Sequence, residues 1–390
     1  MVVALSARNA SSARHYAGAV IQDAGSSYRA AGVDTAAGDL AVELMKASVA
    51  ATHGAAVLGG VGGFAGLYDV TFLKRFDRPL LATSTDGVGT KVAIAQALDK
   101  HDTIGQDLVG MVVDDIVVVG ATPLLMTDYI ACGRVVPQRI ADIVRGIAEA
   151  CAATGTALVG GETAEHPGLL GPDDYDVAGA AVGVVEADAL LGPHRVTDGD
   201  VVIALASSGL HSNGFSLVRH ILAARSISYT QQLAEFGGVV GETLLEPTRL
   251  YTAPVLRLRW LLDAQPDVVN ALSHVTGGGI AANLSRVLPI GSWVEIERST
   301  WSPPGVFRVL SEIAGSTLES AEGTWNLGIG MIAVVSSAAA SAVIGAMKIE
   351  GIEAWSIGVV STATRDLSAF ESGAKGVAGG AVRLVGQYRP

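Results

Sequence analysis

The feature that most constrains the fold is an apolar run that ends in a glycine turn and leads straight into a second apolar run. Residues 79–84 read as a buried strand, residues 85–91 (T-D-G-V-G-T-K) as the turn and residues 92–98 as a helix. Glycine lets backbone N–H groups approach an anion, and a helix N-terminus adds partial positive charge. Asp86 can hold a divalent cation and Lys91 can meet a phosphate, so the turn predicts a site for a metal-bound nucleotide. The Walker A spacing is absent, and an ordinary Asp-Gly turn is the alternative.

Length, charge and cysteine usage narrow the class of protein. The 390 residues are enough for two domains, and 48 glycines suggest several loops lined by backbone. A formal net charge of -12 argues against nucleic acid or an anionic membrane as a partner, although glycine loops and metals can still hold a phosphate. Cys132 and Cys151 form neither a disulfide framework nor a metal-spaced pair, so we expect a cytoplasmic protein. No uninterrupted apolar span is long enough to cross a membrane.

Strand and helix signals alternate along the chain, which predicts two α/β domains. The expected helices cover residues 40–51 (capped by Asp39), 92–98, 107–120, 137–154, 215–224 and 280–288. The expected strands cover residues 79–84, 123–132, 156–159, 175–186, 201–206, 328–335 and 354–360. The pattern restarts after Leu191-Gly192-Pro193, so we expect domains at 28–191 and 192–390. Residues 1–27 are expected to be a disordered extension, with a transit peptide as the alternative.

Three further segments carry glycines or acidic residues that suit a nucleotide and its metal. Residues 59–66 hold closely spaced glycines whose N–H groups can wrap a phosphate, with a mobile turn as the alternative. Asp114 and Asp115 interrupt an apolar helix, where a carboxylate needs a partner charge or a metal. We favour Asp115 as a metal ligand, against pairing with a buried Arg or Lys. Glu162 follows two glycines at the end of a strand, where open α/β sheets bind ligands, and joins Asp86 and Asp115 as the predicted metal set.

Loops in the second half of the chain concentrate hydrogen-bond donors. Residues 207–214 (S-S-G-L-H-S-N-G) lead into a helix whose N-terminus favours an anion. His211 in this loop can donate to a phosphate or act as an acid or base, against the alternative of a structural histidine. Residues 274–279 (H-V-T-G-G-G) repeat the arrangement, and residues 324–328 (T-W-N-L-G) can add one amide to a pocket. Ordinary loops are the alternative for both segments.

Together these segments resemble the phosphoribosylformylglycinamidine cyclo-ligase family, also called aminoimidazole ribonucleotide synthetase. They follow the family's order over about residues 28–360. The matching segments are Y-R-A-A-G-V-D at 28–34, the glycine loop at 59–66, T-D-G-V-G-T-K at 85–91, H-D-T-I-G at 101–105, D-D-I-V-V at 114–118, G-G-E-T-A-E at 160–165, S-S-G-L-H-S-N-G at 207–214, E-P-T-R at 246–249, H-V-T-G-G-G at 274–279 and N-L-G-I-G-M at 326–331.

The resemblance implies two α/β domains, a homodimer formed through the N-terminal sheets, and an ATP site at the junction of domains and subunits. It implies ATP and Mg²⁺ as cofactors and a small nucleotide, formylglycinamidine ribonucleotide, as substrate. The implied reaction closes the imidazole ring of 5-aminoimidazole ribonucleotide in purine biosynthesis and releases ADP and phosphate. ATP would phosphorylate the formamide oxygen, and the amidine nitrogen would then attack the activated carbon, so the protein's task would be positioning and charge neutralisation.

The resemblance also assigns roles to residues of this chain. His211 and Lys91 are the expected catalytic residues. The expected ATP-binding and metal-binding residues are Lys46, Gly62, Gly63, Phe64, Asp86, Gly87, Lys91, Asp115, Gly161, Glu162 and Thr163. The expected substrate-binding residues are Ser208, His211, Ser212, Asn213, Thr276, Gly277, Gly278 and Asn326.

The chain departs from the family's common pattern at several positions. Asp114 stands where Asn is common, Val119 where Gln is common, Thr122 where Glu is common and Leu327 where Cys is common. We expect the first three to border the site and to alter affinity or activity. A related ATP-using kinase and a catalytically silent nucleotide-binding paralogue are therefore the alternative functions.

Overall fold

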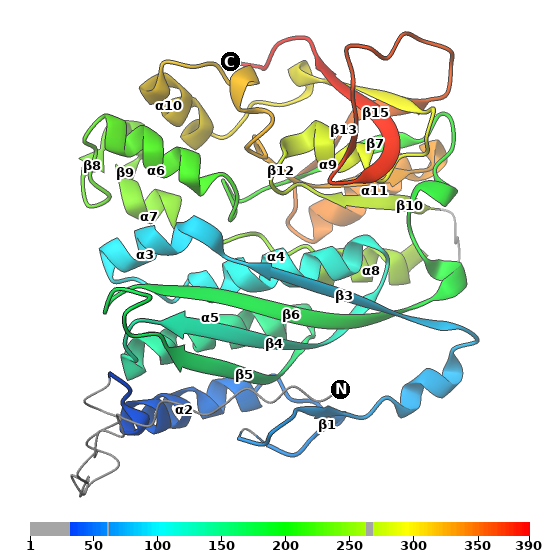
Figure 1. The fold of residues 1–390 in the computed structure, drawn as a ribbon. Coiled ribbons are helices and arrows are strands. Elements are labelled where there is room, and N and C mark those ends of the chain that lie inside the picture. The colour runs from blue at the N-terminus through cyan, green and yellow to red at the C-terminus, as the bar shows by residue number, and fades with distance from the viewer. Residues whose placement is uncertain (1–31, 61, 263–267) are drawn as a thin grey trace, which may run out of the picture.

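Two β-sheets, one from each half of the chain, make up the frame of the protein. The structure is a computed structural model that describes residues 32–60, 62–262 and 268–390. The four-stranded sheet lies in the lower part of Figure 1 and the seven-stranded sheet in the upper part, with helix α4 between them. The extension expected over residues 1–27 lies outside the described residues.

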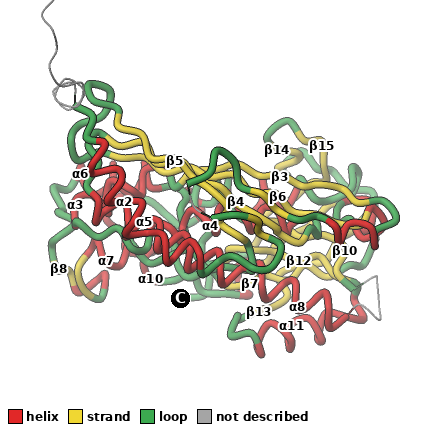
Figure 2. The backbone as a smooth tube through the Cα atoms, turned by 90° about the horizontal axis from the view of Figure 1, so that it is seen from below, coloured by secondary structure: helices red, strands yellow, loops and turns green. Residues whose placement is uncertain are grey.

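The N-terminal half forms the four-stranded sheet, whose strand order is β3-β6-β4-β5. Its strands are β3 (Pro79–Gly87), β4 (Thr122–Cys132), β5 (Ala157–Glu165) and β6 (Tyr175–Glu186). Strands β4 and β5 are parallel, whereas β6 runs antiparallel to both β3 and β4. Helices α2 (Thr35–Ala50), α4 (Ile104–Val118) and α5 (Pro137–Thr154) gather on one side of this sheet, as Figure 2 shows.

Glycines at the contact points let these helices lie close to the sheet and to each other. A Cβ on Gly105 of α4 would lie 2.0 Å from the backbone nitrogen of Ile147 in α5, so only glycine fits at this crossing. A Cβ on Gly179 of β6 would lie 2.5 Å from Cε of Met126. The high glycine content therefore serves close packing as well as loops.

The C-terminal half forms the seven-stranded sheet, whose order is β10-β12-β7-β13-β11-β15-β14. Its strands are β7 (Val201–Ala206), β10 (Val269–His274), β11 (Trp293–Glu297), β12 (Ile329–Val335), β13 (Ala354–Ser361), β14 (Glu371–Ala374) and β15 (Val377–Val385). Helices α8 (Thr252–Leu262) and α11 (Ala340–Ile349) cover one face, and α9 (Gly279–Ser285) covers the other. The alternation of buried side chains along β7 fits this arrangement, since Val202 and Ile203 belong to different core clusters.

Short elements complete the chain. Two short hairpins are β1 (Val57–Leu58) with β2 (Leu67–Tyr68) and β8 (Gln232–Leu233) with β9 (Gly238–Val239), and the remaining helices are α3 (Val92–Leu98), α6 (Phe215–Ala224), α7 (Val240–Leu244) and α10 (Gly305–Ala314). The glycine loop at 59–66 connects β1 to β2, and we call this unit the glycine hairpin.

One core cluster crosses from the N-terminal half into the C-terminal half. It joins Ile104 and Val112 of α4 to Phe215 and Leu222 of α6 and to Phe307 of α10. Burial of these side chains stabilises the two halves together, because neither set would be covered without the other. The domain boundary at 191/192 therefore stays a prediction, since a continuous core passes it.

Most of the expected elements are confirmed, and their errors have a common cause. The helix 137–154 with its Gly155 stop (φ 70°) and the strands 175–186 and 201–206 are as predicted. The strand expected at 79–84 continues to Gly87, and the one expected at 156–159 spans Ala157–Glu165. In both cases the glycines lie inside the sheet, because neighbouring strands supply hydrogen-bond partners that outweigh glycine's weak strand preference.

Helix ends account for the other corrections. The first helix begins at Thr35, because Asp34 accepts hydrogen bonds from the backbone N–H groups of Ala36 and Ala37, so the prediction of Asp39 as the cap was wrong. The helix expected at 107–120 spans 104–118, and the one expected at 280–288 spans 279–285. In the described part of the chain, no helix is both long and apolar enough to cross a membrane.

Candidate active site

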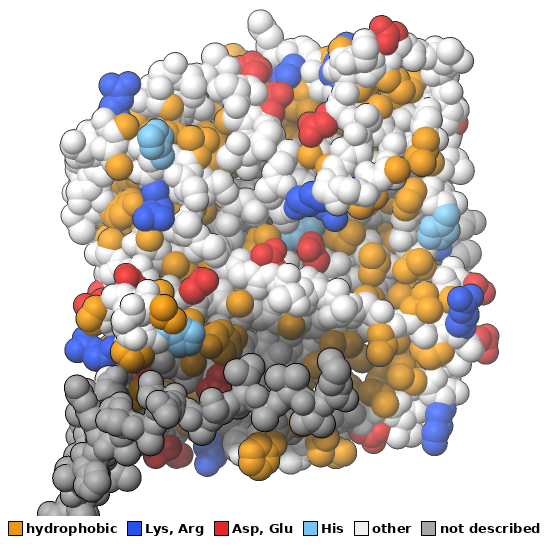
Figure 3. Space-filling view, in the orientation of Figure 1, with side chains coloured by type: hydrophobic (Ala, Val, Ile, Leu, Met, Phe, Trp, Pro, Cys, Tyr) orange, Lys and Arg blue, Asp and Glu red, His pale blue; other side chains and the backbone are white. Residues whose placement is uncertain are grey.

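Asp86, Asp115 and His274 meet in the groove between the two halves. Asp86 lies near the end of β3, Asp115 in α4 and His274 at the end of β10. Nδ1 of His274 lies 2.9 Å from Oδ1 of Asp115. Figure 3 shows acidic, histidine and basic side chains gathered in this band of the surface. The structure therefore brings together two of the three predicted metal ligands, with a histidine that holds one of them.

The electrostatics of the groove confirm that these groups are close. Burial raises the pKa of Asp86, a hydrogen bond from the N–H of Gly87 opposes the rise, and the charge of Asp115 adds to it. Lys375, in the turn between β14 and β15, opposes the rise through its positive charge. Burial lowers the pKa of His274, but its hydrogen bond to Asp115 and the nearby carboxylates outweigh burial, so the net shift is upward. Nε2 of His274 is buried and has no partner among the described residues.

Glu162 does not join this pair within the chain. Adjacent strands pair Asp86 with Gly179, Gly179 with Asp128 and Asp128 with Gly161, so Glu162 lies three strands away, roughly 14 Å across the sheet. It lies opposite Tyr129, whose side chain is exposed. Among the described residues no group of three or more acidic, His or Cys side chains is arranged to hold a metal. The expected three-carboxylate set is therefore not assembled inside one chain.

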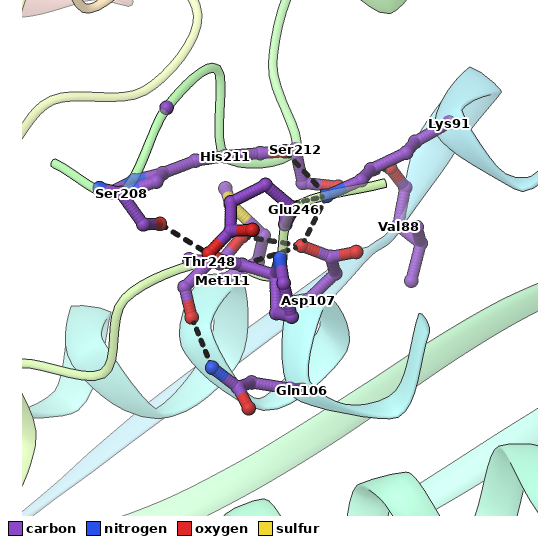
Figure 4. A network of polar contacts seen from close by, with 12 residues as sticks. Val88, Lys91, Gln106, Asp107, Met111, Ser208, His211, Ser212, Glu246 and Thr248 are labelled. Atoms are coloured by element: carbon purple, nitrogen blue, oxygen red, sulfur yellow. Dashed lines mark hydrogen bonds and ion pairs between the residues drawn. The ribbon is translucent and has the colours of Figure 1, made fainter. Parts of the chain in front are cut away.

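Lys91 lies in a buried network instead of at the surface of the turn, as Figure 4 shows. Its ammonium donates to Oδ1 of Asp107 at 2.8 Å and to the backbone carbonyls of His211 at 3.0 Å and Glu246 at 2.7 Å. The side chain is fully buried, and three acceptors use its three protons. In this structure Lys91 has no proton left for a phosphate, so the geometry does not support the role predicted for it.

The Lys91 network ties the two halves of the chain together. Oδ1 of Asp107 also accepts hydrogen bonds from the N–H and the hydroxyl of Thr248, and Gln106 donates to the carbonyl of Thr248. Burial lowers the pKa of Lys91 and raises that of Asp107, while their mutual attraction opposes both shifts. The buried Lys therefore pairs with Asp107, an acid that the sequence did not single out, and not with Asp114 or Asp115.

His211 presents one unpaired nitrogen inside the protein. The backbone N–H of Ser208 donates to Nε2 at 3.2 Å, so the proton of the neutral ring is on Nδ1. Nδ1 is buried without a partner among the described residues. Burial lowers the pKa of His211 well below its ordinary value, and the charges of His274 and Lys91 add to this. The residue also holds a left-handed backbone at φ 59°, a strained conformation that is common at functional sites. His211 is therefore a neutral hydrogen-bond donor.

The loops predicted to bind substrate converge beside His211. Oδ1 of Asn213 accepts a hydrogen bond from the N–H of Gly277, which joins the 207–214 loop to the 274–279 loop. Nδ2 of Asn326 donates to the carbonyl of Gly209, which adds the 324–328 segment. The side chains themselves already have protein partners, since Ser208 donates to the carbonyl of Pro247 and Ser212 to that of Val88. Their geometry supports a role in shaping the loops, with Thr276 and Gly278 completing the turn before α9.

A second region of the predicted site is a cavity beside the glycine hairpin. The cavity has a volume of about 710 Å³ and lies between α2, the glycine hairpin and the β4–β5 edge of the sheet. It brings together the predicted residues Gly62, Gly63, Phe64, Gly161, Glu162 and Thr163. The ring of Phe64 is fully exposed. Lys46, on α2, is not part of the lining and lies exposed 3.8 Å from Glu43.

Asp128 is the cavity residue that the sequence did not single out. It belongs to β4 and lies opposite Gly161 of β5. Burial raises its pKa to about 7. A Cβ on Gly161 would lie 1.8 Å from Oδ1 of Asp128, so the glycine leaves the space that the carboxyl fills. The signal in the sequence was a single acid among mostly apolar residues in a predicted strand. Only the pairing of β4 with β5 shows that this acid lies at the cavity.

Asp114, a departure from the family pattern, has a structural role. It is fully buried, and its carboxylate accepts hydrogen bonds from the N–H groups of Tyr251 and Thr252 and from the hydroxyl of Thr252. These bonds anchor the start of α8, as an N-cap does. Burial raises the pKa of Asp114 to about 6. An Asn could supply the same Oδ1 acceptor.

Of the other two departures, Thr122 lies far from the groove, which corrects the expectation for that residue, whereas Val119 follows Asp115 by one helical turn, so its expected place beside the site stays a prediction. Val119 ends α4 and Thr122 begins β4, where it pairs with Val184. Val184 also pairs with Leu81, five residues along β3 from Asp86, which is roughly 17 Å. Leu327, in contrast, is buried beside Asn326 in a left-handed conformation at φ 47°.

Comparisons with known proteins agree with this arrangement. The sequence profile described as "AIR synthase related protein, N-terminal domain" matches residues 67–185, and the C-terminal domain profile of the same description matches residues 197–367. A phosphoribosylformylglycinamidine cyclo-ligase from Anaeromyxobacter sp. (strain Fw109-5) is 44% identical over 338 residues, covering 86% of this chain and 96% of the relative. This chain belongs to the phosphoribosylformylglycinamidine cyclo-ligase family. The cyclo-ligase of Thermosynechococcus vestitus is 46% identical over 334 residues, covering 85% of this chain and 96% of its own length.

Solved structures of more distant proteins share the fold. Thiamine-monophosphate kinase from Stenotrophomonas maltophilia superposes with a TM-score of 0.59 at 15% identity, covering 90% of this chain and 97% of the kinase. The hydrogenase maturation protein HypE from E. coli gives a TM-score of 0.59 at 19% identity, covering 91% of this chain and 94% of HypE. At such identities the likeness concerns the fold alone.

Proposed function

We propose that this chain catalyses the ATP-dependent ring closure of formylglycinamidine ribonucleotide to 5-aminoimidazole ribonucleotide. The observation that carries the proposal is the match to cyclo-ligases over nearly their whole length, at 44% and 46% identity. The groove adds chemical support, because Asp86, Asp115, His274 and His211 come from both halves of the chain and lie close enough for their charges to interact.

The proposed reaction has two balanced steps. The formamide oxygen of the substrate forms a bond to the γ-phosphorus of ATP, and the bond between that phosphorus and ADP breaks. The amidine nitrogen then forms a bond to the activated carbon, whose bond to the phosphorylated oxygen breaks to release phosphate. One proton leaves the ring nitrogen. The protein supplies orientation and hydrogen bonds for the charge that develops on oxygen.

His211 is suited to hold an oxygen of the substrate or of the transferred phosphoryl group. Its free Nδ1–H is a buried donor, and burial keeps the ring neutral, so it donates without itself losing a proton. The hydrogen bond from Ser208 fixes the tautomer and the ring orientation. His274 offers a second unpaired nitrogen, and the two rings are close enough for their charges to interact.

Asp86 and Asp115 fit a Mg²⁺ site. Mg²⁺ is commonly bound by one or two carboxylates together with substrate phosphates, and both of these carboxylates are at least partly exposed. Oδ1 of Asp86 accepts a hydrogen bond from the N–H of Gly87, and Oδ1 of Asp115 is hydrogen-bonded to His274. The second carboxylate oxygen of each acid therefore remains for the metal. When bound, the metal would neutralise phosphate charge, while His274 holds Asp115 in place.

We also propose that the chain works as a homodimer through the open face of the four-stranded sheet. Leu81 and Tyr129, both in that sheet, are 69% and 41% exposed. Glu162 lies opposite Tyr129, so a second copy on this face would cover Glu162 as well. Sedimentation equilibrium measures the mass directly, and a monomer at micromolar concentration would contradict this part of the proposal.

The decisive experiment measures ADP release with Mg-ATP, with and without formylglycinamidine ribonucleotide, and scores aminoimidazole ribonucleotide in parallel. We expect ADP and the imidazole in equal amounts, and only when both substrates are present. Asp86→Ala should abolish this turnover, whereas Asp188→Asn, an exposed acid just beyond the far end of β6, should not change it. ADP without imidazole would favour a kinase, and binding of ATP without turnover would favour a silent paralogue.

A further inference from the structure

Asp128 differs from the other acids that the fold buries in the N-terminal half. Asp107 and Asp114 each accept several hydrogen bonds from neighbouring residues. The carboxyl of Asp128 has no hydrogen bond or ion pair to another residue in the part of the chain that the structure describes, although burial raises its pKa. Asp128 is partly exposed and lines the cavity beside the glycine hairpin, so a ligand bound in that cavity can reach its carboxyl.

The surroundings of Asp128 suit a flat heteroaromatic ring. One wall of the cavity is apolar, built from Ala41, Met45 and Val49 of α2 with Val144 and Leu158. The exposed ring of Phe64 also lines the cavity. Apolar walls with an aromatic ring and one polar group that sets orientation are the usual composition of such a site.

The backbone around the carboxyl is adapted to keep it there. Gly161 leaves the space that Oδ1 of Asp128 occupies, because a Cβ would lie 1.8 Å away. Gly66, at the end of the glycine hairpin, would place a Cβ 2.5 Å from the carbonyl of Val159, so the hairpin lies directly against β5. These two glycines allow the hairpin, the strand edge and the carboxyl to lie in close contact.

We propose that Asp128 recognises the exocyclic amino group of the adenine base of ATP and thereby sets the nucleotide preference. This inference rests on the proposed function, since it places the base of the nucleotide in the cavity beside the glycine hairpin. Asp128 lies two strands from Asp86, roughly 10 Å, which is within the length of a nucleoside triphosphate. The base would occupy the cavity, and the phosphates would reach the groove by passing around Met126 and Leu108, which pack over Gly179 between the two acids.

The chemistry of the carboxyl gives the expected preference. An oxygen of Asp128 accepts a hydrogen bond from the amino group of adenine. Inosine and guanosine triphosphates carry an oxygen at that position, which would face the carboxyl oxygen and leave both groups unpaired above about pH 7, where the carboxyl is ionised. Purine riboside triphosphate lacks the group and simply loses the bond. A site built to hold one hydrogen-bonding group rejects analogues that cannot make the bond.

The test compares ATP, inosine triphosphate and purine riboside triphosphate in the wild type, Asp128→Ala and Asp128→Asn. Equilibrium binding is measured by calorimetry, and release of the nucleoside diphosphate product is measured by a coupled assay. We expect the wild type to bind ATP about 10-fold to 100-fold more tightly than purine riboside triphosphate, as for a hydrogen bond to a charged group. Asp128→Ala should bring the two affinities within about threefold, whereas Asp128→Asn keeps an acceptor oxygen and should retain the preference for ATP.

Controls separate recognition from folding and from the proposed function. Thermal unfolding checks each variant, and if Asp128→Ala does not fold, Gly161→Ala displaces the carboxyl without removing it and should lose the same preference. Asp188→Ala should leave the preference unchanged. A preference for ATP that survives Asp128→Ala or Gly161→Ala overturns the inference. Because binding is measured without the second substrate, loss of preference in Asp128→Ala supports the inference even where no imidazole product forms.

Discussion

The buried network around Lys91 and the cavity around Asp128 use similar residues in opposite ways. In the network, Lys91 and Oδ1 of Asp107 make hydrogen bonds to both halves of the chain and admit no solvent. In the cavity, Asp128 faces open space beside glycines and has no partner within the described chain. Charge at a glycine-rich turn therefore indicates a binding site only where the fold leaves the charge unpaired.

The difference also separates what each region contributes. A buried charged pair that is broken leaves an uncompensated charge, so the network acts on the stability of the fold. A charged group left unpaired at a cavity costs stability in the free protein and repays it on binding, so the cavity acts on affinity. Substitutions in the two regions should therefore separate in stability and binding measurements.

The largest expected effect is on stability. Lys91→Met removes the partner of the fully buried Asp107 and should lower the free energy of unfolding by about 3–5 kcal/mol. Urea unfolding measures it, with Lys46→Met as the matched control, because Lys46 is exposed on α2 and should change stability by less than about 0.5 kcal/mol. Equal stability of the two variants would place Lys91 outside the supporting network.

His274 combines features of the Lys91 network and of the Asp128 cavity. One ring nitrogen is hydrogen-bonded to Asp115, and the other has no partner among the described residues. His274→Ala removes the group that orients Asp115, so the Mg²⁺ concentration for half-maximal ADP release should rise about 10-fold to 100-fold. The measurement is a Mg²⁺ titration at saturating ATP. His194→Ala, at an exposed histidine near β10, serves as the control. An unchanged Mg²⁺ dependence would remove Asp115 from the proposed metal site.

The fold class and the loops were predictable because they depend on local pattern. Apolar runs, glycine turns and the stop at Gly155 mark elements whose geometry is set by neighbouring residues in sequence. The convergence of residues 207–214 with residues 274–279 was also expected from the family resemblance, and the Asn213–Gly277 hydrogen bond confirms it. Strand ends were less predictable, because Asp86 and Gly161 are held in strands by partners far away in sequence.

The roles of individual charges were the least predictable part. The sequence places Lys91 in a glycine-rich turn that is typical of a phosphate site. It does not show that the ammonium of Lys91 donates to the carbonyls of His211 and Glu246. Likewise, Asp107 and Asp114 have similar places in the apolar helical pattern. The hydrogen bonds that their carboxylates accept come from Thr248 and Thr252, more than 130 residues away in sequence. Burial and pairing are properties of tertiary contact, which periodicity does not report.

The smallest expected effect is a pH dependence that belongs to the cavity. Burial raises the pKa of Asp128 from 3.8 to about 7, so between those values the folded state binds a proton that the unfolded state has lost. Stability therefore falls as pH rises through this window, and the change ends above about pH 7. The side chain in Asp128→Asn cannot titrate. As pH rises from about 4 to about 7, the free energy of unfolding of this variant should therefore increase relative to that of the wild type. One pKa unit corresponds to about 1.4 kcal/mol, and water in the open cavity reduces the shift, so we expect a relative increase on the order of 1 kcal/mol.

Urea unfolding of both proteins from pH 5 to pH 8 measures the difference, and the titration of Asp114 cancels because both proteins keep it. A constant difference across this range would show that Asp128 is already ionised in the folded protein and has a partner there, which would make the cavity resemble the Lys91 network.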